Sequence, residues 1–336
     1  MRPIIVLLLV LWLGLSLATT YTVQSGDTLY SIAQRYATTT AELQRLNRLT
    51  SLDLRVGQVL QVPGGGSASS GGALLEVQAK SGGWKVQHVR SALPGEAVSL
   101  RVSGSSFEPQ MRWNDEQLVV TNDSADWVGI GRELLGSPPK RIQLQIQVGT
   151  EVLRSSLELR ADLRAIENVF VGQQILSSLT QKNRAFELSI LNKAYAIRSI
   201  RAWSAGFALP LKTRHSSAFG GARRYYKGAP INYHYGEDFA APNGTPVLAS
   251  NDGTVSVAQL MPIRGNLIAV DHGAAVTSIY MHLSRIAVRV GQRVRRGAVI
   301  GYVGSTGFST GAHLHWEMRV RGEATNPTRW VGRLFP

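Results

Sequence analysis

The sequence predicts a chain of several mostly β domains, and three features of its 336 residues support this. Between residues 74 and 160, apolar and polar residues alternate in short segments, most strictly in Arg141–Val148. From residue 247 to residue 320, short segments rich in Val and Ile are separated by Gly and Pro. A Gly/Ser stretch at residues 64–72 reads as a flexible linker. At roughly 100–200 residues per domain, the length allows two or three domains.

The first 18 residues have the pattern of an export signal. A short positive start is followed by an apolar run from Ile4 to Leu17, and Ser16 and Ala18 supply the small residues of a cleavage site. The run is shorter than the roughly 20 residues that a membrane-spanning helix needs. We therefore predict export and cleavage after Ala18, with no transmembrane segment left after signal removal. A retained anchor is the alternative. The expected location is the periplasm, the cell wall or the extracellular space.

Residues 21–63 predict a small α+β unit in the order strand, helix, helix, strand. Tyr21–Val23 has strand character, and an apolar stripe with helical spacing follows at residues 29, 32, 33 and 36. Thr39 and Glu42 have the spacing of a capping box for a second helix. The segment from Leu54 to Val62 contains a glycine turn and a final strand.

This unit resembles a LysM module over its whole length. The matching stretches are Tyr-Thr-Val-Gln-Ser-Gly-Asp-Thr-Leu-Tyr-Ser-Ile-Ala at 21–33 and Leu-Arg-Val-Gly-Gln-Val-Leu-Gln-Val-Pro at 54–63. The resemblance implies binding to the N-acetylglucosamine units of peptidoglycan or chitin, in a groove between two loops. The candidate glycan contacts in these loops are Gly26, Asp27, Thr28, Ser51, Leu52 and Leu54. Residues 64–73 would then be the flexible linker that follows the module.

Residues 74–162 predict an antiparallel β-sandwich, with strands at 74–79, 97–102 and 141–148. The segment resembles the immunoglobulin-like domains that precede exported wall peptidases, and Trp113 and Trp127 are its expected core residues. Residues 163–205 then change to helical spacing and predict a helical connector to the last domain.

The whole chain contains no cysteine, which limits its chemistry. Disulfide scaffolds, Cys-ligated zinc, iron–sulfur clusters and thiol nucleophiles are excluded. Any metal site must therefore be built from His, Asp and Glu.

The chain is also strongly basic, with a net charge of +14. Residues 206–336 hold fifteen Lys and Arg against six Asp and Glu. Such a surface attracts polyanions. For an exported chain, anionic wall polymers are more plausible partners than nucleic acid. Charge alone does not distinguish binding from a merely soluble surface.

The last domain, 206–336, contains two histidine patterns suited to a metal. His234 and Asp238 lie four residues apart around a glycine and aromatic residues, so an extended chain would point both the same way. The alternation in His313–Val320 places His313 and His315 on the polar face of a strand, with Glu317 and Arg319. Catalytic zinc takes three N or O ligands and keeps one open position. Two surface histidines on an edge strand are the alternative.

The same domain resembles the lysostaphin/LytM-type zinc murein endopeptidases across several motifs in order. These motifs are His234-Tyr-Gly-Glu-Asp238, Val-Asp-His-Gly at 270–273, Ile-Tyr-Met-His282, Val-Gly-Gln-Arg-Val-Arg-Arg-Gly at 290–297 and Gly-Ala-His313-Leu-His315. The resemblance implies an all-β domain with an open cleft and one zinc ion held by His234, Asp238 and His315. It also implies that His282 and His313 assist catalysis.

The sequence therefore predicts an exported peptidoglycan hydrolase in which zinc-activated water cleaves peptide bonds of murein stems or cross-bridges. LysM would anchor the enzyme to the glycan. The alternative is a non-enzymatic wall-binding activator or scaffold. All five site positions are present, which favours the enzyme. The sequence does not indicate which peptide bond is cleaved.

Overall fold

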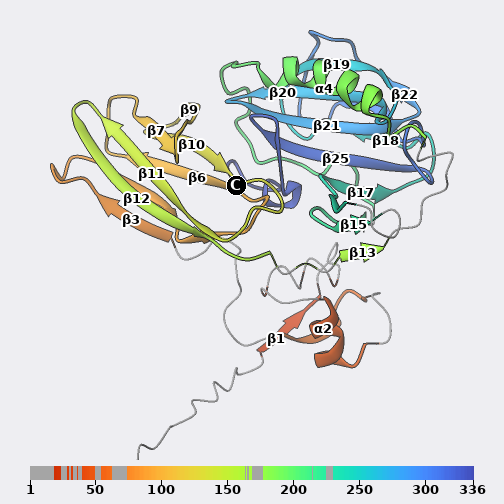
Figure 1. Cartoon of the computed structure of the whole chain (residues 1–336), viewed down its shortest axis with the longest axis horizontal. Helices are drawn as coiled ribbons and strands as arrows, with labels where there is room; N and C mark the ends of the chain where they lie inside the picture. The colour runs from red at the N-terminus through yellow and green to blue at the C-terminus, as the bar shows by residue number, and fades with distance from the viewer. Residues whose placement is uncertain are drawn as a thin grey trace, which may run out of the picture. The chain divides into compact units, whose positions relative to one another are not determined.

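The computed structural model describes residues 19–23, 29, 32, 36, 40–49, 54–62, 74–162, 164, 166–168, 177–213, 215–224 and 230–336. The chain divides into two compact units, Met1–Ser70 and Gly71–Pro336, shown in Figure 1. The boundary falls within the predicted linker 64–73. That linker, the predicted signal 1–18 and five predicted glycan contacts lie outside the described residues, the five being Gly26, Asp27, Thr28, Ser51 and Leu52. Within the described ranges, no helix combines the length and apolarity that a membrane crossing requires.

In the first unit, β1 (Thr19–Thr22) pairs antiparallel with β2 (Val59–Val62), and α2 (Thr40–Asn47) lies between them in sequence. The Asn47 side chain accepts from Gln61 N at 2.5 Å and donates to Gln61 O at 2.7 Å, so it ties the end of α2 to β2. Leu54 is half-buried and packs against the core of this unit. The buried core residues of the described part are Val23, Leu29, Ile32, Leu43, Leu60 and Val62.

The second unit begins with two facing sheets, as predicted for a β-sandwich. Trp113 is buried between them and donates its ring N–H to Glu133, whereas Trp127 is half-buried beside the same core. One sheet has the order β3 (Leu74–Gln78), β4 (Lys85–Val89), β6 (Ala97–Ser103), β10 (Asp126–Arg132) and β9 (Val120–Asp123). The other has the order β5 (Ser91–Ala92), β12 (Glu151–Leu159), β11 (Lys140–Val148), β7 (Gln110–Trp113) and β8 (Glu116–Gln117). The strands of both sheets pair antiparallel except for β5, which pairs with β12 in parallel.

The rest of the second unit is built on a larger sheet. Its order is β14 (His215–Ser217), β17 (Glu237–Ala240), β25 (His313–Val320), β21 (Val276–Leu283), β20 (Gly265–Gly273), β19 (Gly253–Met261) and β23 (Arg293–Val294), with β26 (Glu323–Thr325) pairing β25. Two smaller sheets comprise β18 (Pro246–Leu248), β24 (Val299–Tyr302) and β22 (Arg285–Ile286), and β13 (Ile166–Asn168), β15 (Ala222–Arg224) and β16 (Asn232–Tyr233). The prediction of a mostly β chain is confirmed.

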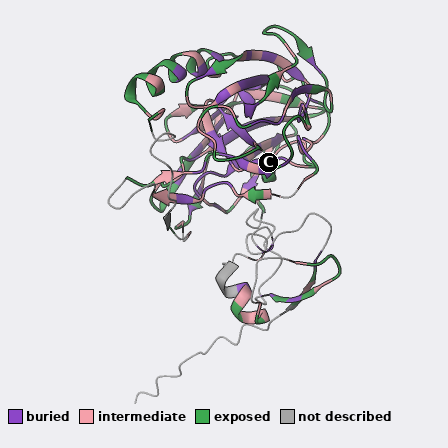
Figure 2. Ribbon diagram, turned by 90° about the vertical axis from the view of Figure 1, so that its right-hand side faces the viewer, coloured by how far each residue is buried: buried purple, intermediate pink, exposed green. Residues whose placement is uncertain are grey.

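Both faces of the large sheet are covered. Leu191 and Ala194 of α4 (Gln181–Tyr195) pack on one face, against side chains of β19, β20 and β21. On the other side lies the main core, in which aliphatic residues pack around several aromatic ones, among them Trp330, which follows the short helix η1 (Pro327–Arg329). The central strands are consequently buried along nearly their whole length, as Figure 2 shows.

The helical connector predicted over 163–205 is only partly correct. Among the described residues of this range, helix α4 begins after Thr180, whose side chain caps it by accepting from Asn183 N. Ile166–Asn168 is instead a strand that pairs in parallel with β15. Residues 196–205 are not helical, because this segment bonds to the end of β20 and to the turn that follows, from Ala202 N to His272 O and from Ala274 N to Ser199 O. Local spacing indicated the helix but could not show these long-range pairings.

The sandwich and the large sheet belong to one compact unit, although the sequence predicts them as separate domains. Arg329 pairs with Glu96 of the sandwich at 2.5 Å. Arg132 Nε donates to Val320 O at 3.1 Å, which links β10 to the end of β25. Side chains from the sandwich therefore contact β25, the strand that carries two of the predicted site residues.

Candidate metal centre

The two histidine patterns meet because β17 and β25 are neighbours in the sheet. In their antiparallel register, Asp238 lies directly opposite His315. His234 lies in the segment between β16 and β17, which passes close over β25 at Gly236. A Cβ at Gly236 would lie 2.4 Å from Trp316 O, so this close approach requires glycine.

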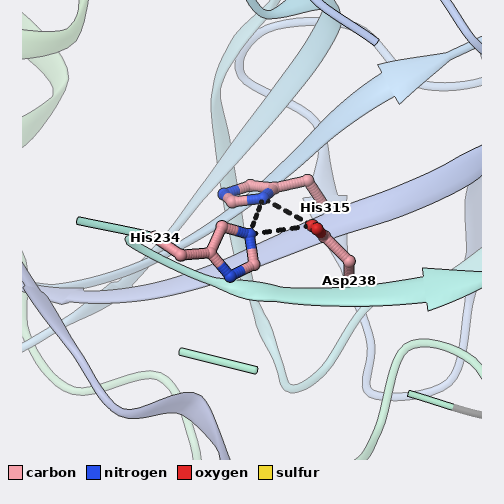
Figure 3. Close-up of side chains that lie close together, drawn as sticks. All are labelled: His234, Asp238 and His315. Atoms are coloured by element: carbon pink, nitrogen blue, oxygen red, sulfur yellow. Dashed lines mark hydrogen bonds and ion pairs between the residues drawn. The ribbon is translucent and has the colours of Figure 1, made fainter. Parts of the chain in front are cut away.

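Three side chains converge at this point, as Figure 3 shows. Asp238 Oδ1 lies 3.0 Å from His234 Nε2 and 2.8 Å from His315 Nδ1, and these two nitrogens are 3.0 Å apart. All three side chains are largely shielded from solvent, since their exposed fractions are 6%, 13% and 10% for His234, Asp238 and His315. The described residues thus contain a compact His-Asp-His group that could hold a metal ion.

The hydrogen bonds on the far side of each imidazole ring determine which of its two nitrogens carries the hydrogen. His234 Nδ1 lies 2.8 Å from Ala218 O, and His315 Nε2 lies 3.1 Å from Glu317 Oε1. Because carbonyl and carboxylate oxygens only accept, these two nitrogens carry hydrogen. The inward nitrogens then present lone pairs beside the Asp238 carboxylate. Such a donor set needs a positive charge at its centre and fits zinc, which binds imidazole nitrogen and carboxylate oxygen.

The pKa shifts support the same conclusion. Burial alone would lower the pKa of His315, but its hydrogen bonds to Asp238 and Glu317 raise that pKa to about 9. Burial alone would raise the pKa of Asp238, yet His234 and His315 hold it well below the usual range. The group therefore favours a positive charge, which is a proton on His315 when no metal competes for the same lone pair.

A buried ion pair fixes His315 from behind. Glu317 Oε2 accepts from Arg319 Nε at 2.6 Å, and Arg319 Nη1 donates to Gly322 O at 2.6 Å. Burial would raise the pKa of the Glu317 carboxyl, but Arg319 and His315 hold it far below its ordinary value. Glu317 is therefore ionised and holds the His315 ring in one orientation.

The remaining two predicted residues, His282 and His313, lie beside the group. Their ring centroids are 4.8 Å apart, and the centroid of His282 is 6.1 Å from that of His315. Each ties Nδ1 to a backbone carbonyl at 2.8 Å, Thr306 O for His282 and Gly311 O for His313, so each leaves Nε2 for chemistry. Burial, together with the charges of His315 and His313, lowers the pKa of His282 to about 3.

His282 adopts a backbone conformation that the sequence does not reveal. Its φ is +61°, in the left-handed region that non-glycine residues rarely occupy. In the pairing of β20 with β21, Asn266 faces Leu283 and Ile268 faces Tyr280, so β21 has one extra residue here. This β-bulge re-aims the His282 side chain.

The structure therefore brings all five predicted site residues together: His234, Asp238, His282, His313 and His315. The His313 side chain is 19% exposed and lies at the accessible edge of the group. A cavity of about 400 Å³ lies elsewhere, between α4 and the β25–β26 turn, and is lined by Tyr195, Arg264 and Arg319 among others. The open cleft predicted beside the histidines stays a prediction.

Sequence reasoning missed several supporting contacts. Glu237 accepts from Phe219 N at 3.1 Å and thereby holds the segment whose Ala218 carbonyl orients His234. The carbonyl of Thr306 orients His282 in the same way. Backbone carbonyls carry no residue signature, so the sequence gives no signal for Ala218 or Thr306. The alternation in His313–Val320, by contrast, already places Glu317 on the same strand face as His315, which it contacts.

Residues 232–327 match the model of Peptidase family M23, a range that contains all five site residues. The chain carries a family M23 peptidase domain. Residues 21–63 match the model of the LysM domain, with the same bounds that the sequence predicts. Both resemblances are therefore confirmed.

Several relatives match this chain over different shares of its length. The chain is 29% identical to the peptidoglycan DD-endopeptidase ShyA of Vibrio cholerae, over 91% of this chain and 73% of ShyA. It is 45% identical to the DD-carboxypeptidase/endopeptidase Mpg of Neisseria meningitidis, over 34% of this chain and only 26% of Mpg. A crystal structure of a peptidase M23 protein from Pseudomonas aeruginosa superposes with a TM-score of 0.55 and 25% identity, covering 71% of this chain and 94% of that chain.

These relations establish the class of the M23 domain. It is a peptidase by its match to this family, and its His-Asp-His group could hold a metal ion, which the sequence predicts to be zinc. The individual roles of the five residues follow from geometry and are proposed below.

Proposed function

We propose that this protein is a zinc endopeptidase that hydrolyses peptide bonds of peptidoglycan. The observation that supports it most directly is the convergence of His234, Asp238 and His315, with His282 and His313 alongside, inside the M23 domain. The relatives ShyA and Mpg are named as endopeptidases, ShyA of peptidoglycan. By analogy with those names, we propose a DD cross-link as the bond.

In this proposal, His234 Nε2, Asp238 Oδ1 and His315 Nδ1 hold the zinc. When bound, zinc supplies a Lewis acid that polarises the scissile carbonyl and acidifies water. Glu317 keeps the His315 ring in place by accepting a hydrogen bond from Nε2 of His315. Ala218 O keeps the His234 ring in place by accepting a hydrogen bond from Nδ1 of His234. The ligand orientation is thus set before substrate arrives.

His282 moves the proton. Its lowered pKa keeps it neutral near pH 7, so Nε2 can accept a proton from the attacking water. From His282 Nε2 the proton then passes to the leaving amine. One water is consumed, with its hydroxyl ending on the carbonyl carbon and its hydrogen on the amine nitrogen. His313 Nε2 lies at the accessible edge of the group. When the ring carries hydrogen on both nitrogens, Nε2 can donate to the carbonyl oxygen as charge develops on it, while Nδ1 stays bonded to Gly311 O.

The carboxylates near the site support a peptide bond over a glycosidic bond as the target. Glycosidases use two carboxyl groups, one as acid and one as base or nucleophile. Here Asp238 contacts both inward nitrogens, and Glu317 is held between His315 and Arg319. Neither is left to act on a sugar.

We further propose that the LysM domain binds the glycan while the peptidase samples nearby peptides. Tethering raises the local substrate concentration without new contacts at the active site. A cell-envelope location, reached by export, fits this substrate. Anionic wall polymers are an additional proposed partner, because the excess positive charge is concentrated in 206–336.

The decisive experiment is digestion of purified peptidoglycan, followed by mass spectrometry of the released fragments. Opened cross-links on intact glycan strands are expected, and a chelator should abolish their release. The chain should contain one zinc. His315→Ala should remove the zinc, whereas His313→Ala should keep it and lose turnover. Retention on the wall with no new amino termini would instead indicate a binding activator, and shortened glycans would contradict the bond assignment.

Deleting residues 21–63 separates the two parts of the proposal. Binding to whole peptidoglycan should weaken, whereas cleavage of a soluble cross-linked fragment should remain. Equal loss of both activities would contradict the anchoring role of LysM.

A further inference from the structure

Helix α4 carries a buried carboxylate that the proposed mechanism does not use. Glu187 is fully buried, on the face of α4 that covers the large sheet. A buried carboxylate is costly unless it is paired and hydrogen-bonded. Its partners are therefore informative about its role.

The partners of Glu187 all belong to the turn between β19 and β20. Oε1 accepts from two consecutive backbone N–H groups, those of Ile263 and Arg264, the second at 3.1 Å. Oε2 pairs with the Arg264 guanidinium. A single helix side chain thus holds one short stretch of backbone.

The carbonyls of the same two residues point to the catalytic side. Ile263 O accepts from Phe308 N at 2.6 Å, and Arg264 O accepts from His282 N at 3.0 Å. The turn therefore lies between the Glu187 carboxylate and the His282 backbone. It is also closely packed against Thr306, since a Cβ at Gly265 would lie 2.3 Å from Thr306 O.

His282 depends on these contacts more than an ordinary strand residue would. A non-glycine residue with positive φ persists only where its surroundings hold it. Two hydrogen bonds do so, from His282 N to Arg264 O and between His282 Nδ1 and Thr306 O. Arg264 O belongs to the turn that Glu187 holds, and Thr306 O belongs to the segment packed against that turn.

We propose that Glu187 is a positioning residue for His282, acting through the Ile263–Arg264 turn. The inference rests on the proposed function, because it takes His282 Nε2 as the proton acceptor. Helix α4 then holds the catalytic geometry in addition to covering the sheet. The competing interpretation is that Glu187 and Arg264 form only a stabilising buried ion pair.

The matched variants are Arg264→Leu and the double variant Glu187→Leu/Arg264→Leu. Both lack the ion pair and neither strands a buried guanidinium, but only the double variant removes the acceptor of the two backbone N–H groups. Replacing a whole buried ion pair by apolar residues is often neutral for stability, whereas Arg264→Leu leaves the Glu187 carboxylate buried without its cation and should lower stability. The two backbone N–H groups still bond to that carboxylate, so kcat is compared at a temperature at which thermal unfolding shows both variants to be folded. Glu187→Gln, which keeps Oε1 as an acceptor, is the conservative variant.

We expect Arg264→Leu and Glu187→Gln to retain kcat, and the double variant to lose about tenfold to a hundredfold in kcat, because small displacements of a catalytic group are that costly. KM and zinc content should be unchanged, since the metal ligands are untouched. Equal kcat in Arg264→Leu and the double variant overturns the proposal. So does a loss in kcat that comes with loss of zinc.

A second readout does not depend on catalysis. In the zinc-loaded chain, hydrogen exchange of the His282 backbone amide reports on its bond to Arg264 O. Exchange should stay slow in Arg264→Leu and become faster in the double variant. If the wild-type chain released no fragments from peptidoglycan, the proposed function would fail, and the exchange rates would still decide whether Glu187 positions His282.

Discussion

Strands β11 and β25 have almost the same pattern in sequence and opposite surroundings in the fold. In β11, Arg-Ile-Gln-Leu-Gln-Ile-Gln-Val ends at Val148, and in β25, His-Leu-His-Trp-Glu-Met-Arg-Val ends at Val320. In β11 the apolar side chains are mostly buried and the polar ones are exposed or half-buried. In β25 every residue after His313 is buried, polar and apolar alike.

The difference comes from what covers the second face. One face of β11 packs in the sandwich core, and solvent covers the other. In β25 the apolar face joins the aromatic core, and the polar face lies beneath surrounding groups. The Arg319 guanidinium, for example, lies 5.5 Å from the ring centroid of Tyr195 in α4 and 5.6 Å from that of Tyr235. Alternation thus predicts which side chains share a face but not whether that face meets water.

Burial makes each polar group of β25 dependent on a partner. His315 is bound to Glu317, Glu317 to Arg319, and Arg319 to the carbonyl of Gly322. In β11 the corresponding glutamines can bond to water. Substitutions in β25 should therefore have large and specific effects, and matching substitutions in β11 small ones.

The largest effect is expected for His315→Ala in β25, compared with Gln143→Ala in β11. His315→Ala removes a zinc ligand, so the metal should be lost, and turnover should fall by at least about a thousandfold, since a Lewis acid contributes several kcal/mol. Gln143 is exposed, and its loss should change neither zinc content nor turnover. Metal analysis and a peptidoglycan digest measure both. Zinc retained in His315→Ala would contradict the ligand assignment.

The next effect concerns stability. Arg319→Met leaves the Glu317 carboxylate buried without its cation, which should cost about 3–5 kcal/mol. The matched control is Lys85→Met in the sandwich, which removes a cation that pairs with Glu76 at an exposed site. That control should leave the thermal midpoint unchanged. Midpoints measured by calorimetry test the difference, and equal midpoints for both variants would remove the contrast between the two strands.

The sequence predicts more of the metal group than of its supports. Local patterns predict that His234 and Asp238 point the same way and that His313 and His315 share one face of a strand. The convergence of His234, Asp238 and His315 is implied by the family resemblance alone, because it depends on the long-range pairing of β17 with β25. The left-handed conformation of His282 is not local, since it depends on Arg264 and Thr306 from other segments.

The cover over β25 was also beyond the sequence pattern. Helical spacing over 163–205 predicts a connector, and Phe186 belongs to the expected apolar stripe, yet Phe186 is 49% exposed. The buried contacts of α4 come from Leu191, Ala194 and the charged Glu187. From the sequence alone, a glutamate in a helix such as Glu187 is expected to face solvent, because the backbone groups that bond to it are not visible there. Only the tertiary structure supplies those partners.

A third prediction concerns zinc binding and pH. The pKa of His315 is raised to about 9 in the chain without metal, so below that pH zinc must displace a proton from Nδ1. The apparent affinity for zinc should therefore rise about tenfold per pH unit from pH 7 to 9 and level off above. Competition with a chelator across this range measures it.

The Glu317→Gln variant sharpens the test. It removes one of the two carboxylates that raise the pKa of His315, so the affinity should level off at a lower pH. A pH-independent affinity in the wild-type chain would show that His315 does not hold the competing proton.

The smallest effect is expected at the start of α4, the helix that the sandwich lacks. Thr180 caps α4 by accepting from Asn183 N at 3.1 Å, and Thr180→Ala should cost about 1 kcal/mol, or about 2–4 °C in the thermal midpoint. Thr180→Ser keeps the hydroxyl and should retain the midpoint. The value of kcat should be unchanged in both variants, because Glu187 lies almost two turns further along α4 and remains bonded to the Ile263–Arg264 turn. A fall in kcat in Thr180→Ala alone would mean that fraying at the first turn reaches His282, and α4 would then position the site as a whole helix rather than through one carboxylate.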